Sequence, residues 1–300
     1  MRWFFFLLFL RSLFPTEIAV TYQFSGGRLG DNLLSYLHAK WFSYKKNIPL
    51  IYKPFPYSNE LMLDVYETFA DVSRPVIRNF KAQGPLHSSR LPILYTCPYF
   101  PEDPWELTHH QWFSFPVDWK NPEFRALARQ IIAPKKQLDL VTPPSHTLNI
   151  ALHIRQGGGF DHSHVYLDMP LKLPPLSFYV EGLQKVIALF PNKPIYCYLF
   201  TDAQDPALLA EQIQNQLPRP ILFDYRHTDN QHDKNVLEDF FSLFQFDVLI
   251  RPQSNFSLIP SLIHDYAVVY SPRDFSLYDN VITITETDFH IDYVLIQRLQ

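Results

Sequence analysis

The 300-residue chain has only two cysteines, Cys97 and Cys197, and only 8 glycines. Two cysteines in apolar stretches exclude a disulfide framework, leave one bridge open, and fit a reducing compartment slightly better. Because glycine is scarce, each cluster of glycines marks a tight turn or a place where a ligand approaches the backbone.

The chain also lacks an excess of basic charge, since 26 Lys and Arg stand against 30 Asp and Glu, for a net charge of -4. This balance excludes the usual nucleic-acid-binding protein, so no nucleic acid is expected as a partner. No internal repeat, low-complexity tract or long charge run is present. With 47% hydrophobic residues, the chain can bury the core of one large domain or of two lobes.

A long hydrophobic run is missing as well. The apolar stretch Trp3–Leu10 follows Met1-Arg2 and is interrupted by Arg11, which makes it too short to cross a bilayer as a helix. No small-residue cleavage site of a signal peptide follows it. We expect residues 1–16 to be an apolar leader that packs on the protein surface or makes a peripheral membrane contact, and a weak signal peptide or signal anchor is the alternative. A cytoplasmic and a membrane-associated location both stay open.

In the second half of the chain, short apolar runs alternate with segments of helical spacing. The expected strands are Leu148–Arg155, Ile195–Asp202, Ile221–Tyr225, Asp247–Ile250, Ala267–Ser271 and Val281–Thr285. The expected helices are Ser177–Phe190, Pro206–Leu217, Val236–Phe246, Phe256–His264 and Phe289–Leu299. This alternation predicts a doubly wound parallel sheet, whose ligands bind beyond the carboxyl ends of the strands.

The first half predicts a second α/β lobe. Its expected strands are Ile18–Phe24, Pro49–Tyr52 and Pro92–Thr96, and its expected helices are Gly30–Lys46 and Glu60–Phe69. The stretch Pro143-Pro144-Ser145 marks the boundary. We therefore expect an N-terminal lobe over residues 17–143 and a C-terminal, doubly wound lobe over residues 144–300 that binds the main ligand.

Three segments carry candidate chemistry. The first, Ser25-Gly26-Gly27-Arg28-Leu29-Gly30-Asp31-Asn32, joins a strand to a helix. Its glycines allow a tight turn, and the helix N-terminus suits an anion. The alternative is an ordinary turn in which Asp31 caps the helix.

The second segment, His153-Ile154-Arg155-Gln156-Gly157-Gly158-Gly159, ends the first strand of the C-terminal lobe. An arginine there can bind a diphosphate through two hydrogen bonds, and the glycines leave room for a ligand. His153 and Arg155 point the same way, because strand side chains alternate. The alternative is an ion pair at the edge of the core.

The third segment runs from Asp239, on a helix, to Ser254, Asn255, Phe256 and Ser257, where the next helix begins. Hydroxyl groups and helix N–H groups there can hold phosphate, and plain helix capping by Ser254 or Asn255 is the alternative.

Asp202 ends another strand of the same lobe, where it can contact a ribose or an acceptor or cap the following helix. The pairs His109-His110 and His162-Ser163-His164 have no cysteine or carboxylate at zinc-ligand spacing, so no metal site is expected.

Taken in order, the three segments resemble motifs of the GDP-fucose-dependent fucosyltransferases, a superfamily that includes α-1,2-, α-1,6- and protein O-fucosyltransferases. Gly-Gly-Arg-Leu-Gly-Asp-Asn is similar to their N-terminal glycine-rich motif, and His153-Ile154-Arg155 to their His-x-Arg motif. The stretch from Asp239 to Ser257 is similar in spacing to their C-terminal motif.

The resemblance implies a GT-B-type fold, with two Rossmann-like lobes and a cleft between them. The C-terminal lobe would bind the nucleotide-sugar, and the N-terminal lobe would lie on the acceptor side. It also implies a metal-independent enzyme that inverts the anomeric centre and uses GDP-fucose as a co-substrate, without any other cofactor. A glycan, glycolipid or protein would be the acceptor.

The same resemblance assigns roles to residues. Arg155 would hold the diphosphate, His153 and Gly157 would support the nucleotide, and Asp239 would bind the guanine edge. Ser254, Asn255, Phe256 and Ser257 would line the phosphates, and Gly27, Arg28, Gly30 and Asn32 would face the cleft.

Two departures from the family pattern matter. Gln156 stands where the α-1,2 and α-1,6 branches carry a second arginine, and Asp31-Asn32 replaces Asn-Gln. The general base has no matching position, and Asp161 is the nearest candidate, with His162 and His164 as alternatives. Two other functions stay open: transfer from a different nucleotide-sugar, and a degenerate module that binds nucleotide or glycan without catalysis.

Overall fold

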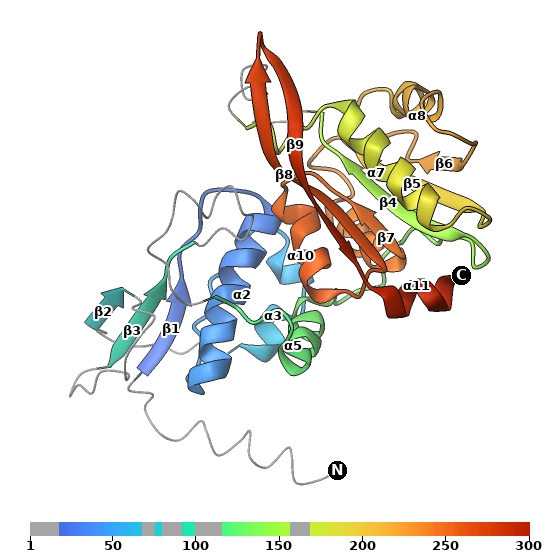
Figure 1. Ribbon diagram of the computed structural model, residues 1–300. Helices are drawn as coiled ribbons and strands as arrows, with labels where there is room; N and C mark the ends of the chain where they lie inside the picture. Colours follow the sequence, from blue (N-terminus) through green and yellow to red (C-terminus); the bar gives the residue numbers. More distant parts are fainter. Residues whose placement is uncertain (1–17, 68–75, 80–91, 100–115, 157–168) are drawn as a thin grey trace. The chain divides into compact units, whose positions relative to one another are not determined.

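The computed structural model describes residues 18–67, 76–79, 92–99, 116–156 and 169–300 (Figure 1). The leader over residues 1–16, Gly157, Asp161 and the histidine pairs therefore lie outside the described residues. The chain divides into two compact units, with the described residues up to Lys135 in unit 1 and those from Lys136 onward in unit 2. The lobe boundary at residues 143–144 stays a prediction.

Unit 1 contains a three-stranded parallel sheet of strand order β1-β3-β2. The strands are β1 (Ile18–Tyr22), β2 (Val76–Asn79) and β3 (Ile93–Cys97). The helices are α2 (Leu29–Lys46), the short η2 (Ser58–Glu60), α3 (Leu63–Tyr66) and α5 (Pro122–Ile132). The expected strands over 18–24 and 92–96 and the expected helix over 30–46 are confirmed.

Two expectations for unit 1 are wrong. Residues 49–52 form only an isolated bridge, between Leu50 and Val20, instead of a strand. The expected helix Glu60–Phe69 shrinks to the single turn α3, because Leu61 pairs with Pro134 in an antiparallel bridge. The backbone N–H of Met62 donates to Ala133 O at 2.9 Å, which keeps this segment out of a helical hydrogen-bond pattern.

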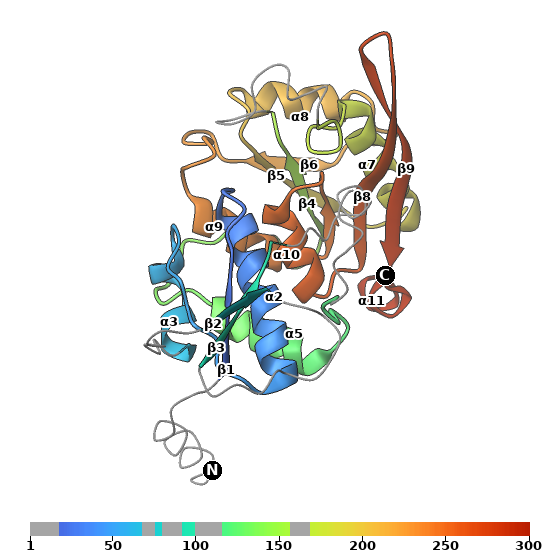
Figure 2. The same ribbon diagram turned by 90° about the vertical axis from the view of Figure 1, so that its left-hand side faces the viewer.

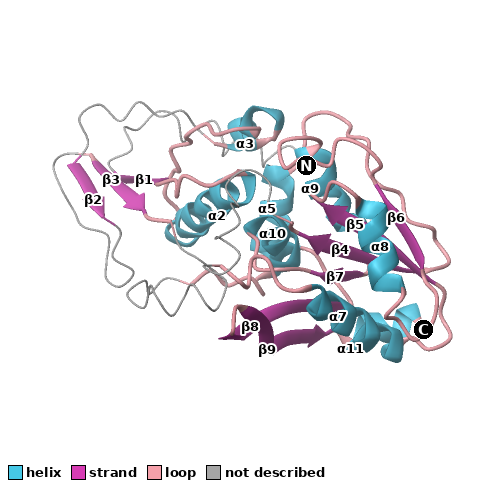
Figure 3. Cartoon of the chain, turned by 90° about the horizontal axis from the view of Figure 1, so that it is seen from above, coloured by secondary structure: helices cyan, strands magenta, loops and turns pink. Residues whose placement is uncertain are grey.

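Unit 2 is built on a six-stranded sheet of strand order β6-β5-β4-β7-β8-β9 (Figures 1 and 3). Its strands are β4 (Leu148–Ile154), β5 (Ile195–Thr201), β6 (Leu222–Tyr225), β7 (Val248–Ile250), β8 (Val268–Tyr278) and β9 (Val281–Ile291). From β4 the chain moves outward through β5 to β6 and then returns to place β7 on the other side of β4. The α/β fold class is confirmed, and the point between β4 and β7 is where such a sheet binds its ligand.

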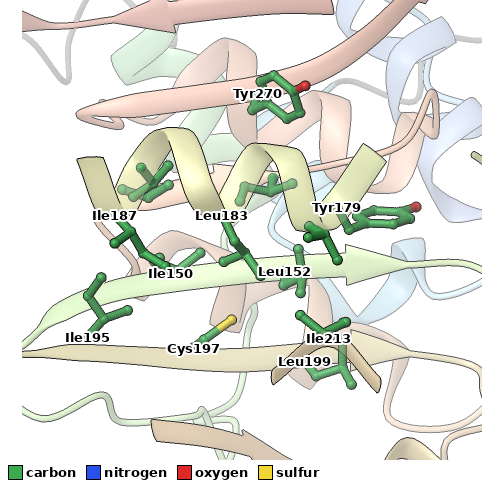
Figure 4. Packing of buried hydrophobic residues seen from close by; sticks show 14 of the residues in the cluster. Ile150, Leu152, Tyr179, Leu183, Ile187, Ile195, Cys197, Leu199, Ile213 and Tyr270 are labelled. Atoms are coloured by element: carbon green, nitrogen blue, oxygen red, sulfur yellow. The ribbon is translucent and has the colours of Figure 1, made fainter. Parts of the chain in front are cut away.

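Helices cover both faces of this sheet. They are α7 (Leu176–Leu189), α8 (Pro206–Gln214), α9 (Val236–Ser242) with the short η3 (Leu243–Gln245), α10 (Asn255–Ile263) and α11 (Tyr293–Leu299). On one face, Leu183 and Ile187 of α7 pack onto Ile150 and Leu152 of β4, in a cluster that also includes residues of α8 and α11 (Figure 4). On the other face, Ala151 of β4 belongs to a second cluster with residues of η3 and α10.

The last strand corrects the expectation of a wholly parallel sheet. β9 pairs antiparallel with β8, because Asp279 and Asn280 form a two-residue turn with φ values of 47° and 61°. Two successive residues with positive φ are typical of a tight hairpin. β9 continues to Ile291, so the expected closing helix Phe289–Leu299 begins only at Tyr293.

Within the part of the chain that the structure describes, no helix is both long enough and apolar enough to span a bilayer. Cys97 in unit 1 and Cys197 in unit 2 are buried, free thiols.

The close approach of α7 to β8 generates the first testable prediction. A Cβ added at Gly182 would lie 2.5 Å from Cδ1 of Tyr270, whose buried ring stacks on Phe178 at 4.9 Å between centroids. Gly182→Ala should lower the free energy of unfolding by about 1–3 kcal/mol through overpacking, measured by urea denaturation.

The control is the same change in a Tyr270→Ala background. There the clash with the Tyr270 ring is absent and only the contact with Ile250 Cγ2 at 3.3 Å remains, so the alanine should cost clearly less than in the wild type. An equal destabilisation in both backgrounds would contradict the packing explanation.

Candidate functional site

Polar side chains follow three neighbouring strands of unit 2 at the carboxyl edge of the sheet. Arg155 and Gln156 come after β4, Asp202 after β5 and Arg251 after β7. The backbone N–H of Gln156 donates to Oδ1 of Asp202 at 2.5 Å, which ties the ends of β4 and β5 together. Because these strands are parallel, their ends meet at one edge, where a doubly wound sheet binds its ligand.

His153 connects β4 to α10. Its Nδ1 lies 2.8 Å from Oγ of Ser257, and its ring contacts that of Phe256 at 5.7 Å between centroids. Both His153 and Ser257 are buried. The second and third sequence motifs, about a hundred residues apart in the chain, are therefore joined by a direct side-chain contact.

Asp239 lies on α9, next to α10. The ring of the adjacent Phe240 contacts that of Phe256 at 5.5 Å, so α9 and α10 pack together (Figure 2). Oδ1 of Asp239 forms an ion pair with Nη2 of Arg226 at 2.8 Å, and each side chain is 29% exposed. Oδ2 of Asp239 accepts no hydrogen bond from the described residues.

Burial raises the pKa of Asp239, and the hydrogen bond from Arg226 opposes this effect. Arg226 directly follows β6 at the same edge of the sheet, and its own pKa is raised by Asp239 against the opposing effect of burial. The pair thus holds a partly exposed carboxylate, one of whose oxygens is bound to Arg226.

The N-terminus of α10 is not capped by a side chain. Ser254 occupies the N-cap position without a side-chain hydrogen bond to the helix, which contradicts the capping alternative for this residue. Asn255 and Phe256 are the first residues of α10, so their N–H groups lie at the positive end of the helix. Such a helix end is suited to a phosphate.

The capping alternative is also wrong for Asp202. Asp205 occupies the N-cap of α8, where its Oδ1 accepts the N–H of Leu208 at 2.9 Å. Asp202 instead binds the backbone of Gln156, at the edge of the sheet.

Arg251 and Tyr179 were not among the predicted site residues. Arg251 is only 2% exposed although it carries a guanidinium group, and it follows β7 just as Arg155 follows β4. A charged residue directly after an apolar strand was the signal that selected Arg155, and it also applies to Arg251.

Tyr179 on α7 lies at the carboxyl end of β4 (Figure 4). Burial raises the pKa of Tyr179 well above its ordinary value; the charges of Arg155 and Arg251 lower it, and that of Asp202 raises it. The charged groups that follow β4, β5 and β7 thus all act on one buried phenol.

In unit 1, the glycine-rich loop forms a reciprocal cap at the start of α2. The N–H of Arg28 donates to Oδ2 of Asp31 at 3.2 Å, so the alternative of Asp31 as a cap is confirmed. Nδ2 of Asn32 donates to Gly27 O at 3.4 Å, and Gly30 is buried in the first turn of α2. A Cβ at Gly27 would lie 2.4 Å from the Asp31 carboxylate, which explains the glycine.

The participation of Gly27, Arg28, Gly30 and Asn32 in a ligand site stays a prediction. Metal independence also stays a prediction. Among the described residues, no group of three or more His, Cys, Asp or Glu is suited to a metal ion.

Comparison with known proteins finds no family model and no curated protein that matches the chain. Solved structures do resemble it. The α-1,6-fucosyltransferase NodZ, crystallised from Bradyrhizobium and soaked with GDP-fucose, is 15% identical, with 92% of this chain and 99% of NodZ covered and a TM-score of 0.47.

Two further structures are of the same kind. A mutant of Arabidopsis thaliana FUT1 in complex with GDP is 12% identical, with 85% and 71% of the two chains covered and a TM-score of 0.49. POFUT1 in complex with GDP-fucose is 11% identical, with 85% and 96% covered and a TM-score of 0.46. These three structures are fucosyltransferases, and the heptosyltransferase TibC from enterotoxigenic E. coli is also similar, at 14% identity and a TM-score of 0.34. Because these TM-scores are below 0.5, the similar structures do not establish a function. The function has to be inferred from what the residues of this chain can bind.

The contact between His153 and Ser257 predicts a difference between two serines of α10. Ser257→Ala leaves the buried imidazole nitrogen without its partner and should lower the free energy of unfolding by about 1–3 kcal/mol. Ser261→Ala, on the same helix, removes only a bond from its hydroxyl to Leu258 O, three residues earlier, and should cost clearly less. Urea denaturation of both variants measures the difference, and equal costs would show that the His153 contact contributes no stability.

Proposed function

We propose that the chain is an inverting glycosyltransferase that transfers fucose from GDP-fucose to a hydroxyl group of a glycan, glycolipid or protein. The observation that carries the proposal is the carboxylate of Asp239. It is partly exposed on a helix packed against α10, whose N-terminus and Ser257 adjoin the end of β4.

Guanine is the base that a carboxylate in this position recognises best. Its N1–H and its N2 amino group are adjacent donors that match the two oxygens of one carboxylate, whereas uracil offers a single N–H donor. Oδ2 of Asp239 accepts no hydrogen bond from the described residues, and Oδ1 retains a lone pair beside its bond to Arg226. Arg226 holds the carboxylate in an ion pair and opposes the rise in the pKa of Asp239 that burial causes.

The diphosphate would bind at the switch point between β4 and β7. The N-terminus of α10 supplies N–H groups and a partial positive charge, and Arg155, half-buried after β4, supplies a guanidinium with paired donors. Ser254 lies at the start of the same helix. His153, fixed by Ser257 and Phe256, would support the nucleotide from the face of the sheet that carries α10.

The reaction would be a direct displacement at the anomeric carbon. An acceptor oxygen forms the new glycosidic bond while the bond from the anomeric carbon to the phosphate oxygen breaks, and GDP leaves with the electron pair. Arg155 and the N–H groups of α10 would stabilise the growing negative charge, so no metal ion is required for this step. A base takes the acceptor proton; Asp161, the sequence candidate, lies outside the described residues.

Gln156 is the residue that keeps two alternative functions open. With glutamine in place of a second arginine, a different nucleotide-sugar donor or a non-catalytic binding module both remain candidates, and donor turnover distinguishes them. The two-lobed arrangement with boundary at residues 143–144 and a peripheral membrane contact of the leader belong to the same proposal.

The guanine assignment predicts that GDP binds at least tenfold more tightly than UDP, because one extra hydrogen bond to a charged acceptor is worth about 1.5–3 kcal/mol. Asp239→Asn, which can accept only one of the two guanine donors, should abolish most of this preference. Glu238→Gln, the adjacent residue, is the matched control and should keep it. Isothermal titration with both nucleotides measures the preference.

The same experiment has a pH arm. Because burial raises the pKa of Asp239, the carboxylate is protonated at a higher pH than an ordinary aspartate. The preference for GDP should therefore weaken as the pH falls, starting above the usual aspartate range. Equal affinities for GDP and UDP in the wild type would contradict the guanine assignment.

A further inference from the structure

A cavity of about 830 Å³ lies in unit 2 beside the proposed nucleotide site. Gln156 and Asp202, which follow β4 and β5, form one wall, and the start of α8 and the loop 231–233 form the others. Its volume falls within the range of small-molecule sites, and its place at the carboxyl edge of the sheet is one where ligands bind.

The charges around the cavity exclude an anionic ligand. Asp202, Asp205 and Asp233 contribute three carboxylates, and His232 is the one basic side chain among the described residues that line it, without any lysine or arginine. A diphosphate would be repelled here, so this cavity differs in chemistry from the site at Arg155 and α10. A neutral or cationic ligand suits it.

The remaining lining favours a ligand rich in hydroxyl groups. The side-chain amides of Gln204, Gln212 and Gln231 make no hydrogen bonds with other described residues, and each can both donate and accept. Leu208 is 49% exposed and adds an apolar surface. Amides and carboxylates around an apolar patch match a sugar ring, whose hydroxyls point outward and whose faces carry C–H groups.

We propose that this cavity binds a saccharide unit of the acceptor that is uncharged or carries an amine, and that it discriminates against uronic acids and other acidic sugars. This proposal rests on the proposed function, because only a glycosyltransferase has an acceptor. Gln156 and Asp202 place the cavity at the end of β4, next to the arginine that would hold the donor phosphates.

The test compares three tetrasaccharides of equal length, built from glucosamine, glucose and galacturonate, as ligands of the full chain in saturating GDP. Wild type should bind the glucosamine and glucose tetramers and bind the galacturonate tetramer least. Gln212→Lys places a positive charge in the cavity without removing a hydrogen bond between described residues. It should weaken the glucosamine tetramer and strengthen the galacturonate tetramer, each by about fivefold, the effect of a unit charge near 4 Å in water.

Gln137→Lys is the matched control: it makes the same substitution at an exposed position outside the cavity lining and should leave all three affinities unchanged. Binding of GDP is measured on the same samples, which separates the two proposals. If the wild type does not bind GDP, the proposed function is contradicted. Normal GDP binding with no difference among the tetramers, or with equal effects of Gln212→Lys and Gln137→Lys, overturns the assignment of the cavity.

Discussion

The parallel pairing of β4 with β5 on one side and with β7 on the other is the constraint on which unit 2 depends. A chain that leaves a central strand in one direction and returns to its other side leaves a gap in helix coverage at the carboxyl edge. The residues that follow these strands therefore meet at that edge. The contact between His153 and Ser257 then fixes the start of α10 against β4.

The chemistry of the site follows from this geometry because the same edge collects groups of different charge. Arg155 and the N-terminus of α10 provide positive potential near β4 and β7, and Asp239 provides a fixed carboxylate farther along. The cavity beside Asp202 is lined by carboxylates and amides. One edge thus holds the three separate places that we propose for a phosphate, for a base with two donors and for a hydroxylated ring.

Local patterns were sufficient to predict most of unit 2. The apolar run of β4 and the helical spacing of α7 predicted both elements to within one residue at each end, because burial dictates these patterns. Arg155 could be selected because it directly follows a recognisable strand, His153 because it lies near the end of that strand, and Asp239 because it lies on a helix that precedes another strand. Their spatial relation depended on the strand order, which no local pattern contains.

Other features needed contacts between distant residues. The bridge between Leu61 and Pro134 prevents the helix that the sequence pattern predicts there. The turn at Asp279-Asn280 makes the last strand run antiparallel to its neighbour. The helix α5 did carry a local signal, since Asn121 caps it and Pro122 occupies its first turn, but it was not among the expected helices. The burial of Arg251 and the cavity beside Asp202 arise only when strands and helices pack together.

The central claim is that the end of β4 holds the diphosphate of a nucleotide-sugar during transfer. Steady-state turnover of GDP-fucose by wild type, Arg155→Lys and Gln156→Arg tests it most directly, with melting temperature as the control for folding. Lysine reproduces the charge of Arg155 without its paired donors, so kcat should fall by about 10²–10³ at an unchanged melting temperature. Gln156→Arg should retain turnover. If Arg155→Lys turns over within about threefold of the wild type, far inside that expected loss, Arg155 has a structural role and the donor site lies elsewhere.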